Sequence, residues 1–361
     1  MKNYNNYFKD KKILITGHTG FKGTWLSLIM LELGSIVYGL SNDNKTLKKN
    51  YNLGIYKNKI KDINIDINDL NRVKKIIHKI NPDHIFHLAA QSLVFKSYEE
   101  PLLTFKTNII GTQNILESIK GLKKCSAVFI TSDKCYENLE IKRGYSENDR
   151  LGGLDPYSAS KASAEILIKS YYNSFFKHNE KIRIVTARAG NVIGGGDWNK
   201  NRLVPDCIKS WSKNESLILR NPESTRPWQH VLEPLRGYIE LSKKINSNKK
   251  LSGQSYNFGP KINKAYTVVE LIKEMSKHWE KVKWKIKKDK YNHYESKLLQ
   301  LNCKKAKKDL NWSPILNFSQ TCYLTIEWYK KYLNSDKKEI QLFFDQIQYY
   351  FKLTRNNNNE K

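Results

Sequence analysis

The chain has 361 residues, 39% of them hydrophobic and 12% aromatic, which is enough to bury the core of one large or two fused domains. It contains no run of about 18 apolar residues, which excludes a membrane-spanning helix, and its first residues lack the apolar segment of a signal peptide. The net charge of +28 comes from lysines spread along the whole chain with abundant Asn and Ile, so we expect neither a nucleic-acid nor a membrane partner.

The first predicted elements are a strand at 12–16, a glycine-rich loop and an apolar helix at 24–33. The loop, Gly17-His18-Thr19-Gly20-Phe21-Lys22-Gly23, has the spacing GxxGxxG. Gly17 permits a tight turn, Gly20 lets the backbone approach a pyrophosphate at the helix N-terminus, and Gly23 allows the helix to pack closely on the strand. This order of elements predicts a dinucleotide-binding site.

The second strand, at 35–40, ends where an acidic residue commonly binds the adenosine ribose. Asp43 is a candidate for this role, and so are Ser41 and Asn42 together. No arginine stands here to bind a 2′-phosphate, which favours NAD over NADP.

Strands and helices then alternate along the chain. Residues 84–88 form a strand that opens into Ala89-Ala90-Gln91-Ser92, where small side chains would let a cofactor lie against the backbone. The alternation predicts an α/β fold, a Rossmann-type doubly wound parallel sheet with right-handed crossovers. The other predicted strands are 59–65, 126–131 and 181–187, and the helices are 68–80, 104–120 and one that begins at Pro156.

Two groups of reactive side chains follow. Ser132, Asp133 and Lys134 come directly after the strand 126–131, and ligands bind at the carboxyl ends of such strands. A hydroxyl, a carboxylate and an amine in a row form an acid/base set. Tyr157 and Lys161 lie four residues apart on the helix that starts at Pro156, so they share one face. A nearby ammonium favours the phenolate, so this pair predicts a tyrosine of lowered pKa acting as a base.

The second half of the chain has few clean strands, and it predicts a smaller, helix-rich lobe over the carboxyl edge of the sheet. Its helices are expected at 202–213, 231–244, 267–277 and 321–333. The arginines Arg202, Arg220 and Arg226 are candidates to hold a diphosphate through bidentate contacts. We expect the dinucleotide-binding domain at 8–195, the substrate-binding lobe at 196–345 with some chain crossing between the two, and a flexible tail at 353–361.

Cysteine and histidine give no sign of a metal site. The cysteines at 125, 135, 207, 303 and 322 form neither a CxxC motif nor a zinc spacing, so we interpret them as reduced thiols of a cytoplasmic protein. Cys135 is interpreted as a packing residue, and His84 and His87 as sheet residues.

Four stretches carry a family resemblance: GHTGFKGTWL at 17–26, TSDKCYEN at 131–138, ARAGNVIGGGDW at 187–198 and RPWQHVLEPL at 226–235. With the Tyr157/Lys161 pair, they make residues 8 to 345 similar to the extended short-chain dehydrogenases/reductases. Within that superfamily the chain resembles the nucleotide-sugar 4,6-dehydratases, and among these the CDP-glucose 4,6-dehydratases.

The resemblance implies a role for each residue of the site. Tyr157 would take the proton of the sugar O4 while a hydride passes from C4 to NAD, Lys161 would bind the nicotinamide ribose, and Ser132 would hydrogen-bond O4. Asp133 would protonate the departing C6 hydroxyl. Lys134 would remove the C5 proton, for which it must be neutral. The product would be a 4-keto-6-deoxy sugar for the synthesis of deoxysugars and surface polysaccharides.

The resemblance also implies binding residues and a homodimer or dimer of dimers formed through the helices 104–120 and 157–176. The pocket for the nucleotide base could be lined by Trp198, Trp228, Gln229 and His230, or these side chains could simply pack. The predicted cofactor residues are Gly17, His18, Thr19, Gly20, Phe21, Lys22, Gly23, Asp43, Asp66, Ile67, Leu88, Ala89, Ala90, Gln91, Asn108, Tyr157 and Lys161. The predicted substrate residues are Ser132, Asn191, Arg202, Arg226, Gln229 and His230.

Other functions stay open at this point. A 4,6-dehydratase acting on a GDP-, UDP- or dTDP-sugar would share the same motifs, and a nucleotide-sugar 4-epimerase would need only the Tyr157/Lys161 pair. A non-enzymatic alternative is a dinucleotide sensor or a nucleic-acid-binding protein, which would have no use for Asp133 and Lys134.

Overall fold

The computed structural model describes residues 2–42, 59–219, 221–261, 265–287, 298–334 and 339–359. Within these ranges, seven parallel strands form one sheet in the order β11-β6-β5-β4-β1-β2-β3. The strand order reverses between β1 and β4, which is where such sheets bind their ligands. The strands of the sheet are β1 (Lys12–Thr16), β2 (Ile36–Ser41), β3 (Ile60–Asn64), β4 (His84–His87), β5 (Cys125–Ile130), β6 (Ile182–Ala189) and β11 (Ser255–Phe258).

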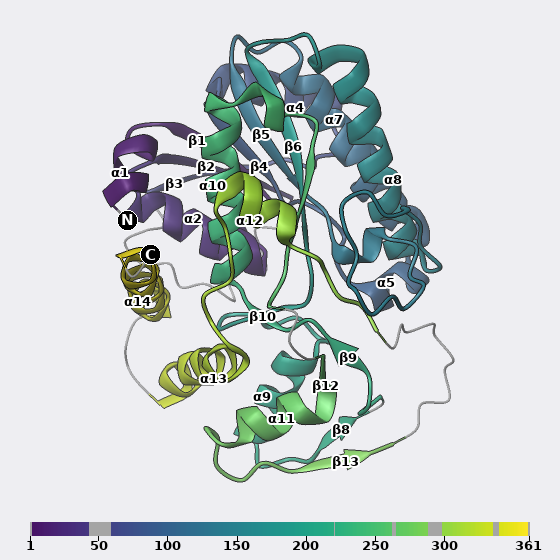
Figure 1. Cartoon of the computed structure of the whole chain (residues 1–361), viewed down its shortest axis with the longest axis vertical. Coiled ribbons are helices and arrows are strands. Elements are labelled where there is room, and N and C mark those ends of the chain that lie inside the picture. The colour runs from purple at the N-terminus through teal and green to yellow at the C-terminus, as the bar shows by residue number, and fades with distance from the viewer. Residues whose placement is uncertain are drawn as a thin grey trace.

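Helices cover both faces of this sheet (Figure 1). On one face lie α2 (Phe21–Glu32) and α10 (Leu232–Ser247), and on the other lie α4 (Leu70–Ile80), α7 (Gly111–Ile119) and α8 (Pro156–Tyr171). The part of the molecule that contains the sheet also includes α1 (Lys2–Phe8), α5 (Val94–Glu99), α6 (Pro101–Phe105) and α12 (Lys304–Leu310).

The strand sequences explain the two layers. Because side chains alternate along a strand, Ile13 and Ile15 of β1 pack into one core cluster with Trp25 of α2, whereas Leu14 packs into the other with Ile115 of α7. Both faces of the sheet are therefore buried, as expected for a parallel sheet between helices.

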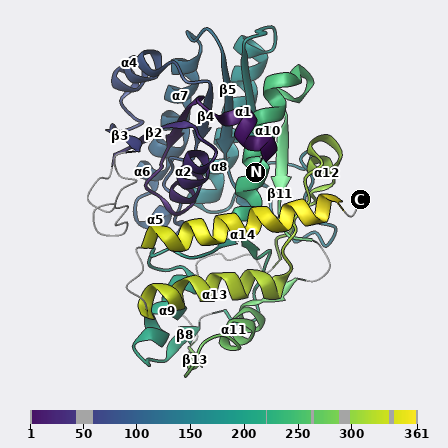
Figure 2. The same ribbon diagram turned by 90° about the vertical axis from the view of Figure 1, so that its left-hand side faces the viewer.

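A second, smaller lobe lies beyond the carboxyl ends of the strands (Figure 1). Figure 2 shows α14 running across the molecule between this lobe and the sheet layer, with α13 beside it. No helix among the described residues is both long and apolar enough to cross a bilayer. β7 (Val192–Ile193) pairs with β10 (Gln229–His230), and α14 spans Glu339–Asn359. The lobe contains α9 (Leu203–Ser212), β8 (Leu217–Leu219), β9 (Thr225–Arg226), β12 (Tyr266–Thr267), α11 (Val268–Ser276), β13 (Trp284–Ile286) and α13 (Phe318–Asn334).

The predicted fold class is confirmed, with local differences. The helix predicted at 104–120 begins at Pro101 and contains a π-helical segment at Lys106–Ile110. The edge strand β11 was not predicted, because it is short and has polar residues at two of its four positions. α14 continues through Asn359, where the sequence suggested a flexible tail, and its apolar residues up to Leu353 contact the core. The division at residue 195 stays a prediction.

Candidate active site

The glycine loop follows β1 at the point where the strand order reverses. Gly17 has a φ of +69°, and a Cβ atom there would lie 2.8 Å from the backbone of Ala89. At Gly23 a Cβ would lie 2.1 Å from the carbonyl oxygen of Gly17, so helix α2 can approach the loop only with glycine at this position. At Gly20 the atom nearest to an added Cβ would be 3.4 Å away. The backbone amide groups at the N-terminus of α2 are therefore open to a phosphate. This loop fits the pyrophosphate of a dinucleotide.

The neighbouring loops are fixed by a few hydrogen bonds. Asn108 donates to the carbonyl oxygen of Gln91 at 3.0 Å, accepts from its amide at 2.9 Å, and donates to Ser160 Oγ at 2.8 Å. It thereby ties the loop after β4, with Leu88, Ala89 and Ala90, to helix α8. This arrangement brings the predicted cofactor residues of the two elements to one edge of the sheet.

At the adenosine end of the predicted cofactor site, His18 and Asp66 make contacts near strand β2. The His18 ring lies against Gly39 of β2 and contacts Asp62 at 3.1 Å through Nε2, while its buried Nδ1 has no partner among the described residues. Asp66 accepts from Asn68 at 2.9 Å and, at 3.4 Å, from Asn42 at the end of β2. The contact of His18 with Gly39 was not predicted. Ile67 is buried and Phe21 begins α2; Thr19 lies in the loop, and Asp43 lies outside the described residues.

Helix α8 begins as its sequence predicts. Asp155 is its N-cap and accepts from the Ser158 amide at 3.0 Å, and Pro156 occupies the first turn. Tyr157 and Lys161 follow on one face, and both are buried, with 8% and 7% of their surface exposed. The helix packs against the short 3-10 turn Asp133–Cys135, which follows β5. The structure thus brings together the two reactive groups that the sequence separates.

The acid/base set has a directed hydrogen-bond pattern. Ser132 Oγ donates to Asp133 Oδ1 at 2.9 Å and accepts from the amide of Lys134 at 3.2 Å, and Ser132 lies close enough to the Tyr157 side chain to lower its pKa. Oδ2 of Asp133 is buried and has no hydrogen-bond partner among the described residues. Lys134 lines a small pocket with Asp155 and Ser158.

Burial dominates the electrostatics of the site. It raises the pKa of Asp133, against the lowering effects of Lys134, the Ser132 hydrogen bond, Lys22 and Arg226. It raises the pKa of Tyr157 to about 12 and lowers the pKa of Lys161 to about 8, although Glu165 favours the charged form of the lysine. The predicted lowering of the Tyr157 pKa counts the positive charge of an oxidised nicotinamide as well as Lys161; in the protein alone, removing the phenol from water outweighs the nearby positive charges.

The predicted substrate residues divide into two groups: those that lie near the acid/base set and those that pack in the interior. Arg226, 7% exposed, and Arg202 lie close enough to the acid/base set to influence the pKa of Asp133 and of Tyr157, respectively. Arg202 also contacts Asp197 at 3.2 Å, and the carbonyl oxygen of Asn191 accepts from the amide of Gln229. Gln229 donates to the carbonyl oxygen of Phe258.

His230 belongs to the second group. It is fully buried beside Trp25. Gln229 and His230 therefore pack inside the protein in this structure, and Arg220 lies outside the described residues.

Sequence reasoning missed one contact of this cluster. Lys22, predicted as part of the cofactor loop, reaches across to helix α10, where its Nζ donates to the hydroxyl of Tyr238 at 3.4 Å. Its ammonium is enclosed, and burial together with Arg202 and Lys161 lowers the pKa of Lys22 to about 7. Tyr238 is fully buried and interacts electrostatically with Asp133 and Tyr157.

Metal chemistry finds no support in this part of the molecule. Among the described residues, no three His, Cys, Asp or Glu side chains are grouped so that they could hold a metal ion. The described cysteines, including Cys135, are free thiols, and burial raises the pKa of Cys135.

A parallel sheet, a glycine loop at its switch point and a buried tyrosine–lysine pair define a Rossmann-type enzyme of the short-chain dehydrogenase/reductase class. The chain belongs to the GDP-mannose 4,6 dehydratase family, whose model matches residues 14–325. It is 40% identical over 338 residues to CDP-glucose 4,6-dehydratase of Salmonella typhimurium, covering 92% of this chain and 94% of the relative. These matches confirm the family resemblance.

Solved structures share the same fold. Pal from Bacillus thuringiensis matches with a TM-score of 0.77 and 26% identity, covering 89% of this chain and 99% of that one. The dTDP-glucose 4,6-dehydratase of Bacillus anthracis, solved in complex with NAD, matches with a TM-score of 0.75 and 22% identity, covering 89% and 97%.

Proposed function

We propose that this protein is an NAD-dependent nucleotide-sugar 4,6-dehydratase, a hydro-lyase that converts CDP-glucose to CDP-4-keto-6-deoxyglucose. The observation that carries the dehydratase reaction is Asp133, a buried carboxylic acid with an unpartnered oxygen beside Ser132 and Tyr157. An oxidoreductase or epimerase of this fold has no need of such an acid. The choice of CDP-glucose rests on the relative that is 40% identical to this chain.

The residues of the site would act in sequence. Tyr157 takes the O4 proton of the sugar, with Ser132 hydrogen-bonded to the same oxygen, as the C4 alcohol becomes a ketone. NAD, held by the glycine loop, would supply the acceptor for the hydride that leaves C4 and the donor of the hydride that C6 receives. Lys134 then removes the C5 proton, made acidic by the ketone, and Asp133 protonates the C6 hydroxyl, which leaves as water. Lys134 finally returns its proton to C5, and the proton that Tyr157 took replaces the one that Asp133 gave, so the overall change is the loss of one water.

The surrounding charges suit such a substrate. Arg226 and Arg202 lie beside the acid/base set and would hold the diphosphate, since guanidinium groups bind phosphate oxygens in pairs. Asp133 must be protonated to act as an acid, and burial, which raises its pKa, favours that form. Asp133, Tyr157 and Lys161 are buried, and the exclusion of water from such positions strengthens each of these interactions.

We also propose that the protein is a cytoplasmic homodimer. Apolar side chains remain exposed on neighbouring helices of one face: Leu102 on α6 is 82% exposed, Ile166 on α8 is 59% exposed and Phe175 is 50% exposed. Large apolar side chains concentrated in this way are typical of a protein–protein interface. A second copy of the chain would cover them with the same helices, as in an isologous dimer.

One comparison of substrates tests the catalytic proposal. The protein is incubated with NAD and, separately, with CDP-glucose, dTDP-glucose, UDP-glucose and GDP-mannose. We expect a 4-keto-6-deoxy product from CDP-glucose, seen as ultraviolet absorbance in base and as a mass lower by one water. A product that retains its C6 hydroxyl would identify an epimerase instead. No change in any of the four sugars would reject the proposal.

A further inference from the structure

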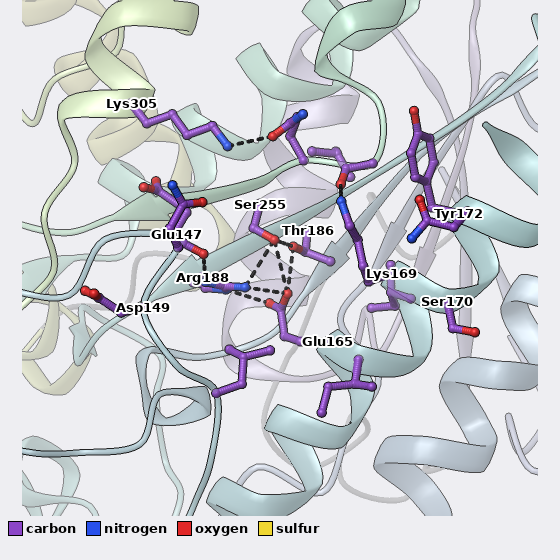
Figure 3. A pocket seen from close by; sticks show the side chains of 18 residues that line it. Glu147, Asp149, Glu165, Lys169, Ser170, Tyr172, Thr186, Arg188, Ser255 and Lys305 are labelled. Atoms are coloured by element: carbon purple, nitrogen blue, oxygen red, sulfur yellow. Dashed lines mark hydrogen bonds and ion pairs between the residues drawn. The ribbon is translucent and has the colours of Figure 1, made fainter. Parts of the chain in front are cut away.

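A buried ion pair lies directly behind the catalytic lysine. Glu165 is one helical turn after Lys161 on α8, and it faces Arg188 of β6; both are 3% exposed. The pair is bidentate, with Arg188 Nη2 at 2.9 Å from Glu165 Oε2 and Nε at 3.0 Å from Oε1. Figure 3 shows the two groups facing each other, joined also to Ser255.

The carboxylate of this pair holds the start of the catalytic segment. Thr131 Oγ1 donates to Glu165 Oε1 at 2.5 Å, and this bond is buried. Thr131 immediately precedes Ser132, the residue that hydrogen-bonds Asp133 and lies beside Tyr157. Any shift of Thr131 would therefore move the serine and the acid together.

The guanidinium of the pair holds the other end of the same segment. Arg188 Nη1 donates to the hydroxyl of Tyr136 at 2.8 Å, and its guanidinium carbon lies 4.9 Å from the centre of the Tyr136 ring. Tyr136 comes two residues after Lys134. One ion pair thus contacts residues on both sides of Ser132, Asp133 and Lys134.

A cavity of about 500 Å³ lies on the far side of the pair, lined also by Glu147, Lys169 and Lys305 (Figure 3). A ligand in this cavity would need free donors, but the guanidinium of Arg188 offers none. Its two remaining contacts are with the Glu147 carbonyl oxygen at 3.2 Å and Ser255 Oγ at 3.1 Å. All five donors of Arg188 are therefore used inside the protein, which suits an anchor for the catalytic segment.

We infer that Glu165 and Arg188 are positioning residues, which hold the acid/base segment 132–134 against Tyr157 and Lys161 through Thr131 and Tyr136. The inference rests on the proposed dehydratase function. Without the anchor, the segment would keep its residues but lose their alignment with the sugar, so the chemical steps would slow while substrate binding would not change.

The test compares two threonine variants that remove hydrogen bonds to the same carboxylate. Thr131→Val removes the bond from the catalytic segment, and Thr186→Val removes a 3.0 Å bond from β6. We expect the melting temperatures of both variants to fall by similar amounts relative to the wild type. Only Thr131→Val should lower kcat, by roughly 10-fold to 100-fold with KM unchanged, since a small misplacement of reacting groups has effects of this size. Tyr136→Phe should behave like Thr131→Val.

The outcomes separate the two proposals. Equal kcat in Thr131→Val and Thr186→Val, with an active wild type, would overturn the positioning role and leave the dehydratase function intact. If the wild type turns over none of the nucleotide sugars, the function fails, and the anchor is then tested by amide hydrogen exchange. In that case residues 132–136 should exchange faster in Thr131→Val than in Thr186→Val, and equal exchange would overturn the inference.

Discussion

Ser132 donates its hydroxyl hydrogen to one oxygen of Asp133, at 2.9 Å, while the other oxygen of that carboxylate is buried with no partner among the described residues. The two oxygens therefore differ: Oδ1 is fixed by the serine, and Oδ2 can carry a proton toward a ligand. Burial raises the pKa of Asp133, which favours the protonated acid. This asymmetry sets the direction in which the acid can act.

Replacing Asp133 should separate the two halves of the reaction. Asp133→Asn keeps the shape and the contact with Ser132 but cannot protonate a leaving hydroxyl. We expect product formation to fall by about 10²- to 10⁴-fold, the usual contribution of a general acid, while reduction of NAD in a single turnover stays within a few-fold of the wild type. Rapid-mixing absorbance of the reduced nicotinamide, with product analysis, measures both steps.

A matched variant controls for the loss of a carboxylate. Asp149→Asn removes an acidic group from the ion pair with Arg143, away from the catalytic segment, and should leave both steps unchanged. Loss of both steps together in Asp133→Asn would contradict the acid role.

The second prediction concerns pH. Burial raises the pKa of Tyr157 to about 12, so the phenol holds its proton at neutral pH, and the positive charge of oxidised NAD should lower that pKa when bound. The base is the deprotonated form, so the rate of NAD reduction should rise with pH between about 6 and 10. Tyr157→Phe should slow this step by about 10²- to 10⁴-fold and abolish its dependence on pH.

Lys161 provides the companion variant. Lys161→Met removes an ammonium beside Tyr157, and we expect the rising limb of the rate to move to higher pH, since the phenolate loses a favourable charge. Single-turnover rates across the pH range measure the shift. A wild-type rate independent of pH would argue against Tyr157 as the base.

The third prediction distinguishes two glycines of the cofactor loop. In Gly23→Ala the new methyl would lie 2.1 Å from the carbonyl oxygen of Gly17, so the loop or the helix must move, at a cost of about 1–3 kcal/mol of stability. In Gly20→Ala the nearest atom is 3.4 Å away, so the fold should keep its melting temperature. The methyl would nevertheless stand where a pyrophosphate approaches the backbone, and we expect at least about tenfold weaker NAD binding.

Melting curves with and without NAD measure both effects, because a bound ligand raises the melting temperature according to its affinity. In Gly20→Ala, NAD should raise the melting temperature less than in the wild type. In Gly23→Ala, the melting temperature should already be lower without NAD. An unchanged response to NAD in Gly20→Ala would show that the pyrophosphate does not approach this position.

The parts that the sequence predicts well are those that depend on local chemistry. The strand before Gly17 and the helix start at Pro156 follow from residues adjacent in the chain, and both occur as expected. The contact of Lys22 with Tyr238 joins residues 216 positions apart, and no local pattern encodes such a meeting. The burial that raises the pKa of Tyr157 in the protein alone was not predicted, because a spacing of four residues shows a nearby lysine but not the depth of burial.

The last prediction concerns the exposed apolar surface of α8. Ile166 is 59% exposed on this helix, and in the proposed dimer it would be covered by the partner subunit. Ile166→Glu would place a charge in that interface, where burial without a partner is costly, so the protein should sediment as a monomer at low micromolar concentration. Ile218→Glu is the matched control, since Ile218 is 57% exposed on β8 in the distant lobe and should leave a dimer. Analytical ultracentrifugation of the three proteins decides, and a monomeric wild type would refute the dimer.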